Sequence, residues 1–282
     1  MLGISSLQPS PKIFRRATHR DAPSPIRAHG QNLLLAAMPA EFRARILPLL
    51  SLVPLRTGCT IYAGDAREAF LYFVTDGIVS HVYETQEGES MEVAVTGSEG
   101  VVGIAPLLGG ESMTSTSIVT LPGHAYRMDA SILDAKFGQV GALRQVLLKY
   151  MQALITHVGQ VAACSRHHCL EQRLCFWILT RLDRMSSLDL PVTHEQIAYL
   201  MGVRREGITE LAGKMQKAGL IQNKRGHVVA IDRRRLEAWS CECYAVVAHE
   251  YERLLPPCPH DRTASGNVFL RGPTHFRVAE MA

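Results

Sequence analysis

Long apolar stretches are missing from this sequence. No run of about 18 or more uncharged apolar residues occurs, and the start, MLGISSLQPSPKIFRR, lacks the apolar block of a secretory signal. These absences argue against a membrane-spanning helix and predict a cytoplasmic protein without a membrane partner. Aromatic residues make up only 6% of the 282 residues, but the apolar share of 47% is ordinary for a folded protein. The length favours two domains over one.

A disulfide framework is missing as well. The seven cysteines are odd in number and follow no regular spacing, which fits reduced thiols in a reducing compartment. The sequence also shows no Ser-His-Asp arrangement and no glycine-rich phosphate loop.

Charge is unevenly distributed along the chain. The net charge is only +4, yet residues 1–30 carry five cations against one anion, and residues 204–235 carry nine cations against three anions. The first stretch, rich in Pro and Ser, is interpreted as a mobile tail, with an organelle transit peptide as the alternative. The second stretch suits a polyanion partner, although a run of charge is often only a solvated surface.

Short runs of β-branched and aromatic residues alternate with glycines between residues 55 and 128, which predicts an antiparallel barrel or roll. Asp76-Gly77 and Glu87-Gly88 are interpreted as hairpin turns between consecutive strands. An enzyme that binds metal inside such a roll needs clustered histidines. The roll offers only His81 and His124, which are 43 residues apart in the sequence. We therefore expect no enzyme.

After Phe137 apolar residues recur every three or four positions, which predicts one long amphipathic helix. A narrow apolar seam of this kind favours a two-stranded coiled coil and hence a homodimer, while packing against the roll of the same chain is the alternative. The expected seam residues are Leu143, Leu147, Met151, Leu154, Val158 and Val161.

Two shorter helices are expected further on. Thr193-His194-Glu195-Gln196 is a capping box, in which Thr193 and Gln196 satisfy the first amides of a helix. Gly202 ends that helix, and a second one is expected from about Arg204 to Ala218. Small Ala198 suits a close crossing of the two helices, and apolar residues at fixed offsets suit a shared core. The pattern predicts a helix-turn-helix, with a generic helical hairpin as the alternative.

Two short β-runs, Leu220-Ile221 and Val228–Ile231, enclose the basic turn Lys224-Arg225-Gly226 and predict a wing. With the roll, the long helix and the helix-turn-helix in this order, the chain resembles the Crp/Fnr family of bacterial transcription regulators. The resemblance covers about residues 31–255. It is most specific in Leu200–Glu206, Lys217–Ile221 and Arg225-Gly226-His227.

The resemblance implies an α+β fold with an N-terminal antiparallel β-roll of jelly-roll-like, cyclic-nucleotide-binding type, a long dimerisation helix and a C-terminal winged helix-turn-helix. The expected domains are a disordered basic tail (1–30), a sensor domain (31–137), a dimerisation helix (138–168), a DNA-binding domain (169–255) and a disordered tail (256–282). The implied partners are double-stranded DNA, a second copy of the chain and RNA polymerase. The alternatives are a winged-helix sensor or scaffold that binds another protein, and a thiol- or metal-responsive version of the regulator.

The resemblance also implies that the second short helix lies in the major groove. Arg205 would then donate to guanine and Glu206 would accept from cytosine, whereas Glu210 stands where some relatives carry a second guanine-reading arginine. The expected base-reading residues are Arg204, Arg205, Glu206, Thr209 and Glu210. The expected phosphate contacts, which fix register without reading sequence, are Thr193, Lys214, Lys217, Lys224 and Arg225.

Relatives that bind cyclic AMP use a glutamate after the roll glycine for the ribose and a later arginine for the phosphate. Ile104 and Met113 stand at these positions here, and an unpaired phosphate in such a pocket is costly. We therefore expect no cofactor and an effector other than a cyclic nucleotide. The expected effector pocket consists of Gly100, Gly103, Ile104, Met113 and Thr114.

Metal ligation is a further hypothesis. Cys164, His167 and His168 share one helical face, and Cys169 follows them. The spacing matches no closed zinc set, so a buried thiol beside solvated imidazoles is the favoured interpretation and no metal is expected. Cys241 and Cys243 would point to different sides of a helix.

Overall fold

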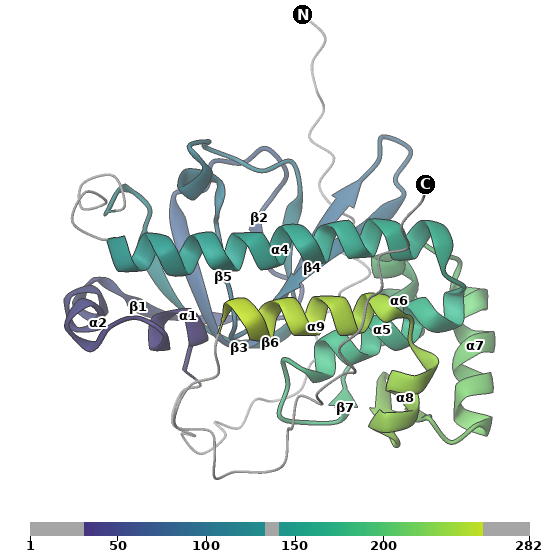
Figure 1. Ribbon diagram of the computed structural model, residues 1–282. Helices are drawn as coiled ribbons and strands as arrows, with labels where there is room; N and C mark the ends of the chain where they lie inside the picture. The colour runs from purple at the N-terminus through teal and green to yellow at the C-terminus, as the bar shows by residue number, and fades with distance from the viewer. Residues whose placement is uncertain (1–30, 133–140, 256–282) are drawn as a thin grey trace, which may run out of the picture.

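The computed structural model describes residues 31–132 and 141–255 (Figure 1). The expected tails, 1–30 and 256–282, and the expected boundary at residue 137 lie outside these ranges. The described chain starts with three short helical elements, α1 (Leu33–Ala36), α2 (Ala40–Ile46) and η1 (Leu47–Leu49). Asn32 caps α1 with its side-chain oxygen and donates to the Val74 and Gly100 carbonyls, which ties this segment to the roll.

The roll is one antiparallel sheet with the strand order β1-β6-β3-β4. Its two longest strands pair with each other, β2 pairs with β6, and β5 pairs with β3. The elements are β1 (Ser51–Leu55), β2 (Thr60–Tyr62), β3 (Phe70–Glu84), β4 (Ser90–Thr96), β5 (Val101–Val102), the short helix η2 (Ala105–Leu108) and β6 (Thr116–Asp129). The antiparallel roll is confirmed.

One expected hairpin turn is wrong. Asp76-Gly77 does not reverse the chain, because β3 runs on through it and the register against β6 shifts on both sides. Gly77 has φ 86°, and a Cβ on the facing Gly123 would lie 2.2 Å from the Asp76 carbonyl oxygen. Two glycines thus permit a β-bulge where the strands bend and approach closely. The other expected turn, at Glu87-Gly88, is present between β3 and β4.

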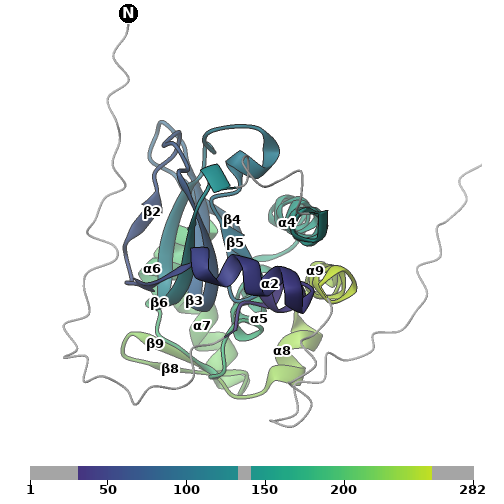
Figure 2. The same cartoon turned by 90° about the vertical axis from the view of Figure 1, so that its left-hand side faces the viewer.

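The long helix α4 (Gly141–His167) packs on the roll, and the last helix, α9 (Glu242–Leu254), returns beside it. Seen end-on, α4 and α9 lie next to each other (Figure 2). Their apolar faces close a core that holds Leu71, Phe73 and Met128 from the roll. Within residues 31–132 and 141–255 none of the helices combines the length and the apolarity that crossing a bilayer demands.

Between α4 and α9 the chain forms the second domain. Its elements are α5 (Leu170–Leu182), β7 (Asp189–Leu190), α6 (His194–Met201), α7 (Arg205–Lys217), β8 (Ile221–Lys224), β9 (His227–Ala230) and α8 (Arg233–Trp239). The strands form a small sheet in the order β7-β9-β8. Its core is continuous with Val82 and Ile118 of the roll, so the domain rests directly on the sheet.

Polar contacts reinforce this junction. The buried Arg181 guanidinium of α5 pairs with the buried Glu92 carboxylate of β4 at 2.5 Å and stacks on Trp177. The turn after α6 also lies against the roll. Ser90 donates to the Tyr199 carbonyl at 2.7 Å, and a Cβ on Gly202 would lie 2.8 Å from the Ser90 carbonyl oxygen.

We expect Arg181→Met to lower the free energy of unfolding by about 3–5 kcal/mol, because it leaves the Glu92 carboxylate buried without a counter-charge. The double variant Arg181→Met/Glu92→Leu should recover most of this loss, since neither charge is then buried. Urea denaturation at neutral pH measures both. Arg253→Ala, which breaks an exposed pair with Glu250, serves as control and should change little. A single variant as stable as the control would contradict the expectation.

Candidate nucleic-acid interface

The pair α6–α7 forms as the sequence predicts. The Thr193 hydroxyl accepts from the Gln196 amide at 3.2 Å, while the Gln196 side chain accepts from the Thr193 amide at 2.9 Å, and this capping box starts α6. Gly202 adopts the left-handed conformation, with φ 63°, and ends it. The Arg173 guanidinium donates to the Met201 carbonyl at 3.1 Å and caps the same end.

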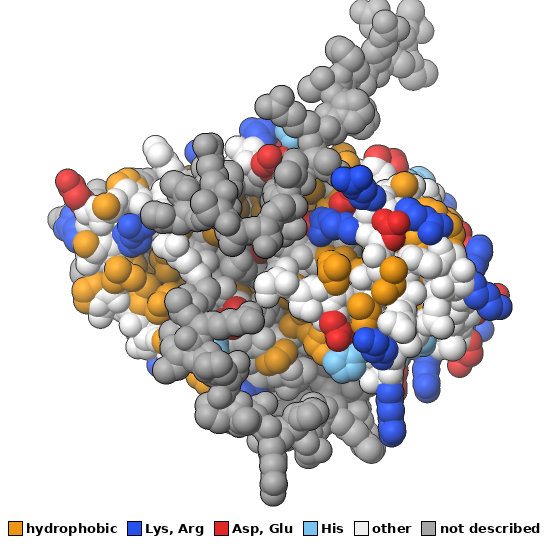
Figure 3. Space-filling view, turned by 90° about the horizontal axis from the view of Figure 1, so that it is seen from below, with side chains coloured by type: hydrophobic (Ala, Val, Ile, Leu, Met, Phe, Trp, Pro, Cys, Tyr) orange, Lys and Arg blue, Asp and Glu red, His pale blue; other side chains and the backbone are white. Residues whose placement is uncertain are grey.

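Helix α7 has one buried and one exposed face. Ile208, Leu211, Ala212 and Met215 point into the core of the domain. The expected base-reading residues Arg204, Arg205, Glu206, Thr209 and Glu210 are all exposed. Lys and Arg side chains gather over the part of the molecule that contains α7 and α8 (Figure 3). Because the cations and Glu206 stand at the start of a protruding helix, this face is able to contact base edges.

The wing, strands β8 and β9, is fixed to the helix pair. The Asn223 side chain donates to the Ala212 carbonyl at 3.0 Å, and the Asn223 amide donates to the Gln216 side chain at 2.7 Å. His194 at the start of α6 bridges Asn223 and Thr209, at 3.2 and 3.3 Å. These hydrogen bonds join helix, turn and wing into one continuous surface.

Among the expected phosphate contacts, Lys217, Lys224 and Arg225 are exposed. Two others have partners within the chain. Lys214 forms an ion pair with Glu171 of α5, and the Thr193 hydroxyl is used in the cap. Lys214 is exposed and its pair is open to solvent, so a phosphate can compete for it at small cost.

The expected seam of α4 differs from the structure. Leu147, Met151 and Leu154 are buried against the roll of their own chain, Val161 packs beside Phe176, and the Leu143 side chain lies outside the described residues. The apolar face that α4 turns to solvent is rotated from the expected seam. Its large apolar side chains are Leu148, Ile155 and Val158, of which only Val158 was predicted. They are 50%, 70% and 38% exposed. The apolar period does not tell which of two apolar faces of a helix is turned to solvent, and the predicted seam followed mostly the inward face.

The expected effector residues lie on two turns of the roll. Gly100 and Gly103 are buried and Ile104 packs on the core, whereas exposed Thr114 donates to Tyr83 and the half-buried Met113 accepts from the Asp65 amide. Space near the glycines is taken by the chain itself. A Cβ on Gly100 would lie 2.6 Å from the Tyr150 hydroxyl of α4.

The start of η2 is also occupied from within. The buried Glu68 carboxylate accepts from the Ala105 amide at 2.7 Å. Burial raises the pKa of Glu68, and the hydrogen bond from Ala105 opposes that rise. The Ala105 amide, next to Ile104, is therefore already used by a carboxylate of the same chain.

The expected metal candidates separate into two pairs. His167 and Cys169 are exposed, whereas Cys164 and His168 converge with Cys241 and Cys243. The expectation that Cys241 and Cys243 diverge is wrong, because Cys241 is the N-cap of α9 and lies outside the helix.

Comparison with known proteins agrees with this architecture. Residues 52–139 match the cyclic nucleotide-binding domain, and residues 172–239 match the Crp-like helix-turn-helix domain. The chain belongs to the Crp/Fnr family of transcription regulators.

The regulator is similar to the global nitrogen regulator of Synechococcus elongatus, with 25% identity over 66% of this chain and 88% of that protein. Two solved structures share its fold. FixK2 from Bradyrhizobium japonicum has a TM-score of 0.60 at 15% identity and covers 68% of this chain and 98% of its own. A Crp/Fnr-family regulator from Eubacterium rectale has a TM-score of 0.58 at 19% identity, with 72% and 94% covered.

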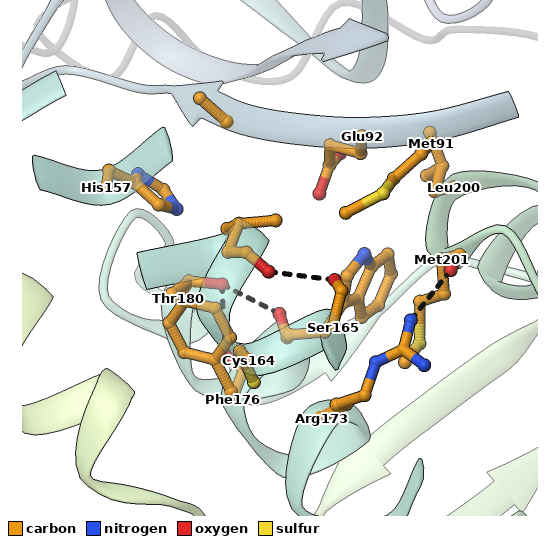
Figure 4. Close-up of a pocket in the computed structure, with 13 residues that line it drawn as sticks. Met91, Glu92, His157, Cys164, Ser165, Arg173, Phe176, Thr180, Leu200 and Met201 are labelled. Carbon is orange, nitrogen blue, oxygen red and sulfur yellow. Dashed lines mark hydrogen bonds between the residues drawn. The ribbon is translucent and has the colours of Figure 1, made fainter. Parts of the chain in front are cut away.

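A small cavity of ≈ 40 Å³ lies where β4, α4, α5 and α6 of the regulator meet (Figure 4). It is lined by Glu92, His157, Cys164 and Trp177 among others. The volume suits a few water molecules and not a nucleotide. No sequence pattern pointed to this junction, because its residues come from segments far apart in the chain.

Two histidines, His81 on β3 and His157 on α4, have pKa values that burial shifts. The partly buried His81 ring lies 2.8 Å from Thr96 and 3.2 Å from Ser117, and Thr96 contacts the Tyr150 hydroxyl. Burial lowers the pKa of His81 to about 4. His157 is 3% exposed, and burial lowers its pKa well below the usual range.

These two histidines predict acid destabilisation. Because their pKa values are lower in the folded than in the unfolded chain, where histidine titrates near pH 6.5, the unfolded chain takes up protons first as the pH falls. The free energy of unfolding should therefore decrease between about pH 6.5 and about pH 4. Denaturation at several pH values measures this, and His81→Gln should flatten the dependence whereas the exposed control His167→Gln should not. Equal slopes for all three proteins would count against it.

Proposed function

We propose that this regulator binds inverted-repeat DNA as a homodimer and that the start of α7 reads the bases. The observation that carries the proposal is the exposure of Arg204, Arg205 and Glu206 on a helix whose other face is fully buried. The side chains are aimed outward, and the wing beside them is fixed by Asn223. A second copy would present its own α7 about one DNA turn away, roughly 34 Å.

Base reading and phosphate contact fall to different residues in this proposal. Arg205 donates a bidentate pair to guanine, Glu206 accepts from cytosine, and Arg204, Thr209 and Glu210 stand beside them. Lys217 from the end of α7 and Lys224 and Arg225 from the wing contact phosphates. The acidic Glu210 in this row is expected to disfavour a guanine at its position, since guanine offers only acceptors in the major groove.

The proposed dimer interface is the outward face of α4, formed by Leu148, Ile155 and Val158. Leu148 and Ile155 are seven residues apart, and Ala162, also exposed, continues the same line. This heptad spacing is that of a two-stranded coiled coil. Regulators of this family act as dimers, and exposed apolar side chains of this size on one helix face lose their contact with water in such a dimer.

We further propose that the effector is not a cyclic nucleotide. The support is the Glu68 carboxylate at the start of η2 and the Tyr150 hydroxyl against Gly100. Ile104 and Met113 stand where cyclic-AMP-binding relatives carry the ribose-binding glutamate and the phosphate-binding arginine, so neither position supplies a counter-charge to a cyclic phosphate. Because the chromosome and RNA polymerase lie in the bacterial cytoplasm, the proposal places the protein there, with RNA polymerase as a partner and without a catalytic step.

Arg205→Ala should weaken binding to the preferred site by roughly 1–3 kcal/mol and relax the preference at one base position, because it removes a bidentate contact. Lys224→Ala should weaken binding to all sequences alike. Because one phosphate contact is lost, the slope of log K against log salt concentration should become smaller by about 1. The measurement is a titration of a selected inverted repeat and of random duplex DNA at several salt concentrations.

Leu188→Ala, an exposed residue in the loop before β7, is the matched control for that titration. Equal, sequence-independent losses from both the Arg205 and the Lys224 variants would contradict the docking of α7. Binding to random duplex that does not vary with salt would instead favour the alternative of a winged helix that binds another protein.

Ile155→Asp should convert the dimer to a monomer without unfolding it, because the side chain is exposed in one chain and buried only between two. Sedimentation at several protein concentrations measures the change, with circular dichroism as a check on folding. The control Leu108→Asp changes an exposed apolar residue of η2, far from α4 in sequence. A folded Ile155→Asp dimer as tight as the control would rule out this interface.

A further inference from the structure

Three cysteines and one histidine converge at the base of the DNA-binding domain, and we call Cys164, His168, Cys241 and Cys243 the Cys3His cluster. Each offers one ligand atom, and these atoms all lie within 4.8 Å of one another. The Cys164 and Cys241 sulfur atoms are 3.5 Å apart, and the Cys243 sulfur is 3.5 Å from His168 Nδ1. A tetrahedral ion with metal–sulfur bonds of about 2.3 Å holds its ligand atoms about 3.8 Å apart. The spacing is therefore that of one ion's coordination shell.

Local backbone structure produces this convergence from two helix ends. Cys164 and His168 share a face at the end of α4, because the His168 amide donates to the Cys164 carbonyl at 3.0 Å and extends the helical turn. At the start of α9, Cys241 occupies the N-cap, and Cys243 stands in the first turn. Since Cys241 is outside the helix, both thiols can face the same point.

The histidine is oriented as a metal ligand requires. His168 Nε2 lies 3.3 Å from a Glu242 carboxylate oxygen. A proton on Nε2 donated to Glu242 leaves the lone pair on Nδ1, the nitrogen that faces Cys243. A carboxylate behind a ligating histidine is the usual second partner in zinc sites, where it fixes the tautomer and raises the basicity of the ring.

The surroundings favour a bound cation over free thiols. The three cysteines are between 2% and 6% exposed, and the side chains of Val161, Phe176 and Val247 enclose them. Closely spaced buried sulfur atoms repel each other when ionised, and a soft divalent cation removes that repulsion. The short mutual distances fit a single ion better than an iron–sulfur cluster, whose cysteines are distributed over separate irons.

We propose that the Cys3His cluster binds one thiophilic divalent cation, Zn²⁺ by the nature of its donors, and that this ion joins the end of α4 to the start of α9. Binding replaces the thiol protons, which are released to solvent, and involves no oxidation or reduction. The inference does not depend on DNA binding. Residues 169–240, the whole winged domain, lie between the two pairs of ligands in the sequence. A bound ion would therefore hold the two ends of that domain together.

The test uses the full chain, purified with reductant and without oxygen, and Co²⁺ as the probe. One equivalent of Co²⁺ should produce the intense visible bands of a tetrahedral ion and a thiolate-to-cobalt band in the near ultraviolet, and Zn²⁺ should displace it. The metal content of the purified protein, measured by mass spectrometry, should approach one zinc per chain. Wild-type protein that shows neither zinc nor the cobalt bands overturns the proposal, whatever the variants do.

Variants locate the site. Cys241→Ser and His168→Ala should lose the intense tetrahedral cobalt bands, and Glu242→Gln, which removes only the carboxylate behind the histidine, should weaken Zn²⁺ binding roughly 10- to 100-fold. The matched controls are Cys169→Ser and His167→Ala, neighbours that are exposed and outside the cluster. Circular dichroism shows which variants fold. Bands that persist in a folded Cys241→Ser, or vanish in the controls, place the metal elsewhere.

An oxidation experiment distinguishes metal binding from a disulfide between Cys164 and Cys241. The Cys164 and Cys241 sulfur atoms lie 3.5 Å apart, so the main competing outcome is a disulfide between them. If the reduced chain binds no metal and mild oxidation joins these two residues with the loss of two hydrogens, peptide mapping will show it. The pair is then a disulfide switch, and the metal proposal is wrong.

Discussion

The buried ion pair between Arg181 and Glu92 decides where the DNA-binding domain sits. A guanidinium and a carboxylate removed from water are each costly, and their contact at 2.5 Å, together with the hydrogen bond and the stacking of Arg181 on Trp177, offsets that cost. The pair therefore tolerates little displacement of α5 relative to β4. Because α6 and α7 share their core with α5, this pair, together with the apolar junction and the Ser90–Tyr199 hydrogen bond, holds the helix-turn-helix against the roll.

Helix α4 has two apolar faces, and the sequence alone does not show which one packs on the roll. Leu147, Tyr150 and Leu154 are needed by the roll, while Leu148 and Ile155 face outward. Since both faces are apolar, the predicted seam followed the inward face and shared only Val158 with the outward one. The helix-turn-helix was predictable in detail for the opposite reason, because its capping box at Thr193 and its left-handed Gly202 are local features whose partners lie within a few residues.

Long-range contacts explain what the sequence did not reveal. Glu68 lies 37 positions from Ala105, Glu92 lies 89 from Arg181 and Cys164 lies 77 from Cys241. None of these separations forms a recognisable spacing, so the loop carboxylate, the interdomain ion pair and the full Cys3His cluster became visible only with the fold. The Asp76-Gly77 turn was misread because a dipeptide typical of hairpins also suits a bulge.

Gly202, which ends α6, is constrained both by its left-handed backbone and by the carbonyl of Ser90 beside it. Its left-handed backbone would by itself accept asparagine, the common substitute at such positions. The carbonyl of Ser90, 2.8 Å from where a Cβ would stand, denies it that alternative. A side chain at this position would therefore push the helix-turn-helix away from the roll on which it rests.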